Sequence, residues 1–291
     1  MKLDFKPVVA GDIEKLKPFY GLRPNKACDS VFLDCFLWKD YYHVECAVSE
    51  DRAALWLVGR GGQVSTAMPM CREEDLPYFF HQLEEYFAEV LHKPFYIALA
   101  DEEAVQYLGL DPKEYEVEEQ VDLKDYLYDG EAMRTLAGKK LHKKKNHLNA
   151  FMREYEGRYE YRRLCCSDRH EVWEFMERWR QKKADADALE DSLEYEVAGI
   201  HEILKNCSSL SVRMAAVYVD GQMEAFTIGS LNERENMAVI HIEKANPDIK
   251  GLYQFINQQF LVHEFPDVAL VNREDDVGME GLRKAKMSYN P

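Results

Sequence analysis

The chain has 291 residues, of which 46% are hydrophobic, so it is too apolar to be disordered and long enough for one large or two medium-sized domains. Its 37 Lys and Arg against 53 Asp and Glu give a net charge of −16, which argues against a general nucleic-acid-binding or membrane-surface protein. The charge is uneven, since residues 1–137 carry a net −13 and residues 138–291 a net −3. Residues 138–163 alone hold nine basic and three acidic side chains, which makes one basic stripe in an acidic chain.

The first half predicts one strand, two short helices, three strands, an amphipathic helix, a buried strand and a short helix, in that order. The amphipathic helix is the clearest of these, because apolar residues recur every three or four positions from Leu76 to Leu91 and Pro94 ends the pattern. The expected ranges are 2–9 (strand), 12–20 and 30–42 (helices), 43–48, 53–58 and 63–70 (strands), 76–91 (helix), 95–100 (strand), a helix after residue 101, and a strand-like alternation over 114–123.

The second half repeats that order of elements without detectable residue-level identity. Asp220 and Gly221 form a strong hairpin signal between two of its strands. The expected ranges are 158–164 (strand), 168–183 and 192–206 (helices), 210–219, 222–231 and 237–243 (strands), 251–264 (helix), 268–271 (strand) and 279–287 (helix).

The doubled order predicts a mixed α/β (α+β) protein of two similar domains, each with a mixed, mostly antiparallel sheet flanked by helices. We expect the domains to cover residues 1–125 and 157–291. Residues 126–156 would join them, with one long basic helix over 130–156. The second domain would hold the active cleft.

Several functions lack their usual motifs. The sequence has no Walker loop, no GxGxxG opening a helix, no HExxH and no GxSxG. Nine histidines are scattered without ligand spacing, so no metal site is predicted. A signal peptide and a transmembrane run are not apparent either. Seven cysteines without CxxC pairs indicate reduced, mostly buried thiols, and together these features predict a cytoplasmic protein.

The basic stripe is the first of three candidate functional segments. In GKKLHKKKNHLNAF, the apolar Leu141, Leu148 and Phe151 fall near one helix face, and the lysines project elsewhere. Crowded lysines repel one another, so they suit an anion-binding site better than they stabilise a helix. The alternative is that they only form the solvent-exposed face of the helix and bind nothing. The candidate phosphate-binding residues are Lys139, Lys140, Lys143, Lys144 and Lys145.

The second segment, HIEKANPDIKGLY, runs from the end of a strand through a turn into a helix. A helix N-terminus favours an anion or a carbonyl oxygen, which makes Lys250 and Gly251 candidate binding residues. Glu243, at the end of the strand, is the best-placed general base. The alternative is a surface glutamate paired with Lys244 or Lys250.

The third segment, NREDDVGMEGLRKAKMSYNP, follows a buried strand and is dense in charge. Loops after central strands of such sheets gather ligand-binding groups, although a salt-bridged terminal helix is the alternative. The candidate residues here are Asp276, Arg283 and Lys286, with Asn272, Arg273, Asp275 and Gly278 in support.

These three segments, in this order, resemble the family of the C-terminal catalytic domain of phosphatidylglycerol lysyltransferases, which includes soluble stand-alone members. The resemblance runs from about residue 29 to residue 291, and NRxxDxGxxGLRxxKxxxxP is its most specific part. It implies two tandem acyl-CoA N-acyltransferase (GNAT-like) domains, similar to Fem-type aminoacyl transferases. The first domain lacks an anion-site loop, which indicates a degenerate copy.

The resemblance implies an aminoacyltransferase or related acyltransferase in which an amine or hydroxyl acceptor attacks the donor carbonyl directly. Glu243 or Asp276 would take the acceptor proton, and Arg283 and Lys286 would hold phosphate or the oxyanion. Acetyltransferases of this fold hold CoA in a glycine-rich loop, but NPDIKGLY has one glycine and MCREEDLPYFF has none. We therefore expect aminoacyl-tRNA, bound through 138–163, rather than acetyl-CoA as donor. A CoA-dependent N-acetyltransferase and a non-catalytic binding protein remain alternatives, and the acceptor is open.

Overall fold

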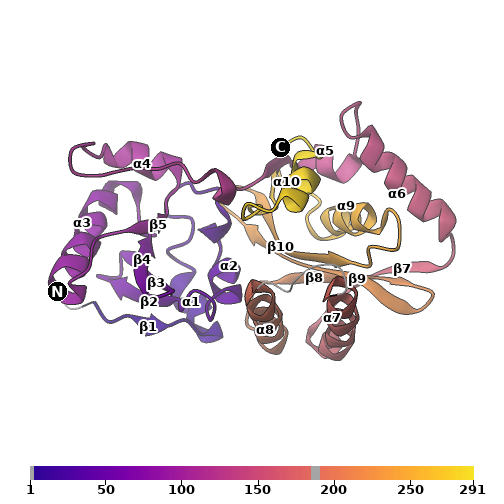
Figure 1. Ribbon diagram of the computed structural model, residues 1–291, viewed down its shortest axis with the longest axis horizontal. Coiled ribbons are helices and arrows are strands. Elements are labelled where there is room, and N and C mark those ends of the chain that lie inside the picture. The colour runs from indigo at the N-terminus through magenta and orange to yellow at the C-terminus, as the bar shows by residue number, and fades with distance from the viewer. Residues whose placement is uncertain (1–2, 185–190) are drawn as a thin grey trace. The chain divides into compact units, whose positions relative to one another are not determined.

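The computed structural model describes residues 3–184 and 191–291, and the chain divides into two compact units, Met1–Glu119 and Gln120–Pro291. Each unit contains one mixed sheet flanked by helices (Figure 1). The predicted order of elements is confirmed in both units. In the described part of the chain, no helix combines the length and the apolar character needed to cross a membrane.

The first unit has a five-stranded sheet in which the strands follow one another in chain order. The last pair, β4 and β5, is parallel, and the other pairs are antiparallel. Helix α3 buries the predicted apolar stripe, and its Leu76, Phe79 and Leu83 have no exposed surface. The elements are β1 (Lys6–Pro7), α1 (Ile13–Leu16), α2 (Phe32–Leu37), β2 (Glu45–Ser49), β3 (Ala53–Arg60), β4 (Gln63–Ala67), α3 (Leu76–Tyr86), β5 (Ile97–Leu99) and α4 (Glu102–Leu108).

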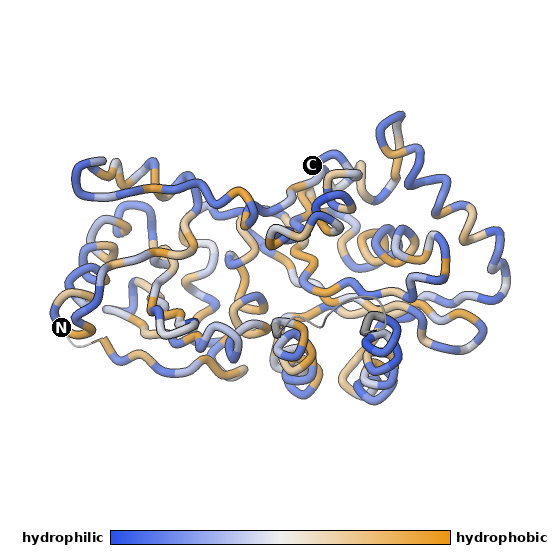
Figure 2. Tube along the Cα trace, viewed as in Figure 1, coloured by the Kyte–Doolittle hydropathy of each residue, from blue (hydrophilic) through white to orange (hydrophobic). Residues whose placement is uncertain are grey.

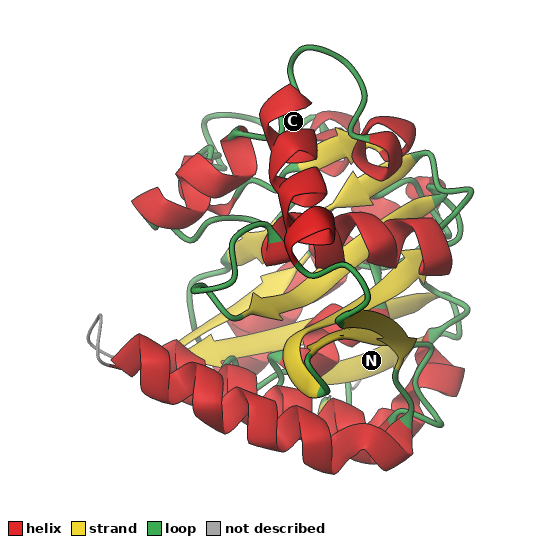
Figure 3. Cartoon of the chain, turned by 90° about the vertical axis from the view of Figure 1, so that its right-hand side faces the viewer, coloured by secondary structure: helices red, strands yellow, loops and turns green. Residues whose placement is uncertain are grey.

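The second unit has a six-stranded sheet of order β6-β11-β10-β9-β8-β7, in which β10 and β11 are parallel and the other pairs are antiparallel. Helix α9 covers one face of the sheet, while α7 and α8 cover the other (Figures 1 and 3). The elements are β6 (Leu127–Asp129), α5 (Gly130–Thr135), α6 (His142–Glu154), β7 (Tyr159–Arg163), α7 (Arg169–Ala184), α8 (Asp191–Asn206), β8 (Arg213–Val219), β9 (Gln222–Asn232), β10 (Met237–Ala245), α9 (Leu252–Glu264), β11 (Leu270–Asn272) and α10 (Glu280–Met287).

The prediction of one long helix over 130–156 is wrong. Helix α5 ends at Thr135, the next residue, Leu136, has a left-handed φ of 47°, and Gly138 with a φ of 89° turns the chain before α6 begins. The expected connecting segment also contributes a strand, because β6 pairs antiparallel with β11 and so completes the sheet of the second unit. The residues on both sides of Gly138, Leu136, Ala137, Lys139, Lys140 and Leu141, are good helix formers, which is why the sequence predicted a continuous helix.

The strand-like alternation over 114–123 is also not a strand. Its valines, Val117 and Val121, are 58% and 61% exposed, and residues 121–123 form a short 3-10 helix. An alternating pattern forms a strand only where one face is buried against a partner, and the described residues offer this segment none.

The prediction that all seven cysteines are reduced is wrong for two of them, because Cys166 and Cys207 form a disulfide. The bond joins the 3-10 turn before α7 to the residue that follows α8, with a sequence separation of 41. The other five cysteines are not part of a disulfide: Cys28, Cys35, Cys46, Cys71 and Cys165.

Reduction of this disulfide should lower the free energy of unfolding by about 2–4 kcal/mol, because the bond restricts a loop of this length in the unfolded chain. Urea unfolding with and without a phosphine reductant measures the change. The variant Cys165→Ser serves as a control, since the exposed Cys165 thiol is free and its loss should leave the reductant effect intact. Superimposable oxidised and reduced curves would contradict the expectation.

Gly251, a predicted anion-binding residue, is a packing residue at the start of α9. A Cβ atom there would lie 2.2 Å from the backbone oxygen of His147 in α6, and the φ of Gly251 is +86°. The missing side chain therefore lets α6 approach α9 closely. A similarly close approach occurs at Gly130, where a Cβ would lie 2.2 Å from the backbone oxygen of Val268.

Gly251→Ala should destabilise the second unit by more than the roughly 1–2 kcal/mol that a left-handed alanine costs, because it adds a backbone clash to that strain. Gly157→Ala is the matched control, since Gly157 has a φ of +70° and open space around its Cβ position. Chemical denaturation measures both variants. Equal losses of stability in Gly251→Ala and Gly157→Ala would show that the close contact between α6 and α9 does not contribute to stability.

Candidate functional site

Polar side chains meet where the parallel strands β10 and β11 end. Because β10 and β11 run in the same direction, their carboxyl ends lie at one edge of the sheet, where ligand-binding groups gather in open sheets. Glu243 Oε1 accepts a hydrogen bond of 2.9 Å from Arg273 Nη2, and Glu243 Oε2 accepts one of 2.7 Å from Asn257 Nδ2. The side chains of Glu243 and Arg273 are only 9% and 14% exposed. This buried ion pair is neither of the surface pairs, with Lys244 or Lys250, that the sequence offered as alternatives.

Tyr289 and Lys144 bring the C-terminus and helix α6 to the same group. The Lys144 Nζ lies 4.2 Å from the centre of the Tyr289 ring, and the Arg273 Cζ lies 5.0 Å from it. Burial, together with the nearby Arg273, lowers the pKa of Lys144. Burial also raises the pKa of Tyr289 to about 12, so the phenol is neutral at physiological pH. Glu243, Asn257, Arg273, Tyr289 and Lys144 are called the Glu243 cluster below.

The loop after β11 is held by its own asparagine and aspartate side chains. The Asn272 Oδ1 accepts a hydrogen bond from the Glu274 backbone N–H at 2.6 Å, and the Asp275 Oδ1 accepts one from the Val277 N–H at 3.0 Å. Asp276 Oδ1 accepts one from the Gly278 N–H at 2.9 Å. These are Asx-type turns, in which a side chain replaces a backbone partner.

Asp276 is buried, with 1% of its surface exposed, and four donors surround it. Arg283 donates from Nε and Nη2 at 2.8 Å each, Tyr126 donates its hydroxyl at 2.5 Å, and the fourth donor is the Gly278 N–H. Arg283 also binds Asp122 at 2.6 Å. The Arg283 hydrogen bonds, and after them those from Tyr126 and Gly278, hold the pKa of Asp276 well below its usual range. A carboxylate this acidic is a weak proton acceptor.

Lys286 is likewise engaged within the loop. Its Nζ donates to the backbone oxygens of Arg273, at 2.6 Å, and of Asp275. Burial lowers its pKa, and the nearby Glu274 opposes that effect. Lys286 thus holds the loop backbone at Arg273 and Asp275, while Arg283 holds the side chain of Asp276.

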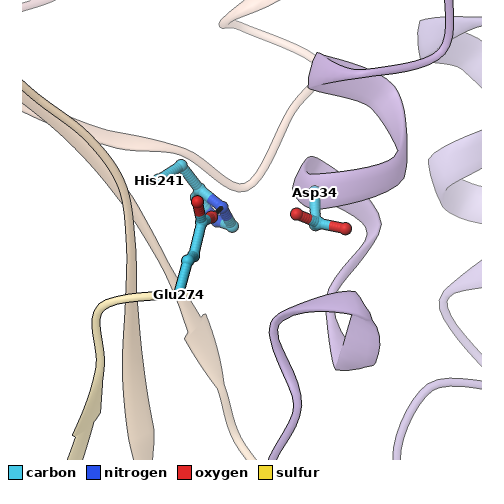
Figure 4. A group of neighbouring side chains, drawn as sticks. All are labelled: Asp34, His241 and Glu274. Carbon is cyan, nitrogen blue, oxygen red and sulfur yellow. Dashed lines mark hydrogen bonds and ion pairs between the residues drawn. The ribbon is translucent and has the colours of Figure 1, made fainter. Parts of the chain in front are cut away.

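A second buried chain of polar groups lies across β9, β10 and the loop. The Ser230 Oγ is 2.8 Å from His241 Nε2, and His241 Nδ1 is 2.8 Å from Glu274 Oε1. Figure 4 shows the His241 ring beside the Glu274 carboxylate. The His241 side chain has no exposed surface, and burial raises the pKa of Glu274 well above its usual value. The φ of Glu274 is +56°, a strained backbone for a non-glycine residue, and it directs this carboxylate toward His241.

The basic stripe divides between two places. Leu141, Leu148 and Phe151 are buried, as predicted, while most of α6 is hydrophilic (Figure 2). A pocket of about 590 Å³ at the start of α6 is lined by Leu136, Ala137, Gly138, His142 and three lysines. Its charged members are Lys139, Lys143 and Lys145, whereas Lys144 joins the Glu243 cluster, and Lys140 and Lys250 are exposed without lining the pocket.

Comparison with known proteins adds to this geometry. The family model described as phosphatidylglycerol lysyltransferase, C-terminal, matches residues 21–291. The chain belongs to this family.

An uncharacterized protein of Mycoplasmoides gallisepticum is 30% identical to this lysyltransferase-family chain over 168 residues, which is 57% of the chain. The chain spans about half, 52%, of that relative's length.

Solved structures agree on the architecture. A conserved protein of unknown function from Bacteroides thetaiotaomicron matches with a TM-score of 0.88 at 27% identity, over 100% of this chain and 96% of that chain. L-PGS from Bacillus licheniformis matches with a TM-score of 0.67 at 16% identity, over 100% and 91%. FemX matches with a TM-score of 0.62 at 7% identity, over 98% and 94%. The fold is GNAT-like, of the Fem type, and family and fold fit a transferase of the phosphatidylglycerol lysyltransferase type.

Within this lysyltransferase-family chain, the structure brings together residues that the sequence placed in separate segments. Glu243 and Arg273 contact each other directly, and Asn272, Asp275, Asp276 and Gly278 shape the loop that carries Arg273. Sequence reasoning missed Asn257, Tyr289 and His241. Asn257 is buried in α9 among mostly apolar residues, and a buried polar side chain is a signal for a bound partner, while Tyr289 gave no signal of its own.

Proposed function

We propose that this protein transfers an aminoacyl group from aminoacyl-tRNA to an amine or hydroxyl acceptor. One observation supports the proposal most directly: Lys144 extends from the basic helix α6 to the buried Glu243 cluster. A surface suited to a polyanion and a buried carboxylate suited to proton transfer are therefore parts of one structural unit.

In the proposed reaction, the acceptor attacks the ester carbonyl of the donor directly. A new bond forms from the acceptor to the carbonyl carbon, and the ester bond to the terminal ribose of the tRNA breaks. Glu243 takes the proton that the acceptor loses and passes that same proton to the ribose oxygen as it leaves. A carboxylate has about four acceptor positions, and the described residues occupy two of those on Glu243, so room remains for the acceptor's proton.

We propose that the pocket at the start of α6 binds phosphates of the donor through Lys139, Lys143 and Lys145. Lys140 and Lys250, which are both exposed, would add to the positive electrostatic potential around this pocket. The contacts of Arg283 and Lys286 favour a positioning role in the loop over the oxyanion contact that the sequence suggested. Such a donor also fits a cytoplasmic protein.

Transfer and binding assays test the proposal together. The protein is incubated with aminoacyl-tRNA and a panel of amine and hydroxyl acceptors, and binding of charged and uncharged tRNA is titrated against salt. Each phosphate that is neutralised should contribute roughly 0.7–0.9 log unit of affinity per log unit of salt. Lys143→Glu with Lys145→Glu should weaken binding at least about tenfold and flatten the salt slope.

The matched control reverses two exposed lysines of the first unit, Lys93→Glu with Lys113→Glu, which changes the net charge equally. Equal loss of tRNA binding in the two double variants would show that binding depends on the net charge of the protein and not on the lysines of α6. No binding of tRNA at low salt would remove this donor, and thermal stabilisation by acetyl-CoA would then identify a different one.

A further inference from the structure

A disulfide closes one end of the helix pair α7 and α8, which covers the face of the second sheet opposite to α9 (Figure 1). Cys166 lies in the turn before α7, and Cys207 directly follows α8. Both cysteines are half-buried, and their neighbours Cys165, Ser167 and Ser208 are exposed, so a thiol can approach the bond. Accessible disulfides are, as a class, the ones that thiols cleave readily, in contrast to buried structural bonds.

The same helix pair holds the end of β10 through one residue. Lys244 Nζ lies 2.8 Å from Glu196 Oε2 in α8 and 4.6 Å from the centre of the Trp179 ring in α7. The side chains of Lys244 and Glu196 are only 14% and 15% exposed, so solvent and salt screen this ion pair little. Lys244 therefore fastens β10 to both helices.

Lys244 adjoins Glu243, the proposed base. Successive residues of a strand point to opposite faces of the sheet, so Lys244 contacts α7 and α8 while Glu243 accepts a hydrogen bond from Asn257 in α9. Helix α7 also packs on the neighbouring strand, since the ring centres of Phe175 and Phe226 are 5.8 Å apart and Phe226 is the β9 residue opposite Lys244. Because the two side chains share one stretch of backbone, a displacement of Lys244 displaces Glu243 as well.

The disulfide and the Lys244 contacts lie at different points along the helices. Trp179 lies ten residues beyond the start of α7 and Glu196 ten residues before the end of α8, which places both roughly 15 Å along the helix axes from the bond. Cleavage of the bond frees two helix ends without removing any contact to the sheet. It returns conformational freedom to α7 and α8, and local openings of these helices then extend to the Lys244 contacts.

We propose that reversible reduction of the Cys166–Cys207 disulfide regulates this protein by loosening the contacts through which α7 and α8 hold Lys244 and the Glu243 cluster. The reductant is a dithiol. One of its thiolates attacks a protein sulfur and forms a mixed disulfide, and the other cysteine leaves as a thiolate that takes up a proton. The second thiol of the reductant then displaces the remaining cysteine, so two electrons pass to the protein and the reductant becomes a cyclic disulfide.

Hydrogen–deuterium exchange of the full chain tests this link without any substrate. The protein is labelled with the disulfide intact and after treatment with dithiothreitol, in pulses of seconds to minutes that report local openings rather than unfolding of the whole unit. Reduction should raise exchange in α7, in α8 and at residues 243–245 at least about tenfold, and leave α9 and the first unit unchanged. Oxidised dithiothreitol or glutathione disulfide should restore slow exchange. Unchanged exchange at residues 243–245, an equal rise in α9, or failure of the bond to re-form would overturn the proposal.

Cysteine variants assign the response to this bond. Cys207→Ser should show the fast exchange without reductant and should not respond to dithiothreitol. Cys165→Ser is the matched control, because Cys165 is not part of the disulfide, and it should respond like the wild type. A response to dithiothreitol that persists in Cys207→Ser would overturn the proposal.

A lysine variant tests the route to β10. In Lys244→Met, reduction should still raise exchange in α8, but exchange at residues 243–245 should be equal in the oxidised and reduced protein. Lys205→Met is the matched control, because Lys205 forms its ion pair with Glu202 within α8, and it should keep the full response. A wild-type response at residues 243–245 in Lys244→Met would overturn the route through Lys244.

The regulation and the proposed reaction fail in different ways. A reversible exchange response at residues 243–245, without transfer from any aminoacyl-tRNA, would retain the regulation and refute the reaction. Equal rates of aminoacyl transfer by the oxidised and the reduced protein would retain the reaction and refute the regulation.

Discussion

Glu243→Gln should reduce the turnover of aminoacyl transfer by about 100-fold or more, because the amide keeps the size of the carboxylate and cannot accept the acceptor's proton. The oxygen of the introduced amide can still accept a hydrogen bond from Arg273, and the Asn257 amide can turn so that its oxygen accepts from the new NH2, so KM should change little. Single-turnover kinetics with saturating donor measure the chemical step.

Glu264→Gln is the control for this prediction. Glu264 is also a buried carboxylate in an ion pair, with Arg163, and it lies on α9 like Asn257. Its replacement removes a comparable charge away from the Glu243 cluster and should leave turnover near the wild-type value. Unchanged turnover in Glu243→Gln would exclude Glu243 as the base, and similar losses in both variants would indicate damage to the fold.

Asp276→Ala should lower the free energy of unfolding of the second unit by about 3 kcal/mol. Removal of one partner from a buried ion pair typically costs about 3–5 kcal/mol, and the lower end applies because Arg283 is 40% exposed and retains Asp122. The Tyr126 hydroxyl and the Gly278 N–H lose their acceptor as well. Chemical denaturation measures the loss, and Asp275→Ala, which removes a single backbone contact to Val277, should cost about 1 kcal/mol or less.

The contribution of Asp276 should also depend on pH in a fixed direction. The pKa of Asp276 is lower in the folded protein than in the unfolded chain, where it is about 3.9, so the stabilisation is complete above that value. It is lost as the pH falls toward the lower folded-state pKa. The difference in unfolding free energy between wild type and Asp276→Ala should therefore be smaller at pH 3 than at pH 7, and a constant difference would contradict the assignment.

Much of the fold follows from local patterns. The apolar stripe of α3, the Asp220-Gly221 hairpin and the alternation of β8 and β9 each specify an element within a few residues, because burial on one face enforces their periodicity. The same reasoning failed over 130–156 and 114–123, where the outcome depended on left-handed residues and on the absence of a strand partner among the described residues. The spacing of apolar residues in the sequence shows neither a left-handed backbone nor the absence of a strand partner.

The sequence indicated many of the residues of the candidate site, but it did not show which of them contact one another. Charge density marked Glu243 and the residues after β11, yet which carboxylate meets which cation depends on the register of β10 against β11. From sequence, Glu243 was the best-placed base and Asp276 was the other candidate. The four donors around Asp276 and the open acceptor positions of Glu243 now favour Glu243. Asn257 was missed because α9 carries four amide side chains, and the local sequence does not show which of them is buried.

The contact between Gly251 and His147 has a consequence for how this protein can change. Helix α6 docks through a backbone approach and through Leu148 and Phe151, so the lysines on its outer side take no part in holding it in place. Mutations can therefore alter the charge of that side freely while the docking is preserved. If α6 binds the donor as proposed, substitutions on its outer surface offer a way to redesign donor choice without rebuilding the interior.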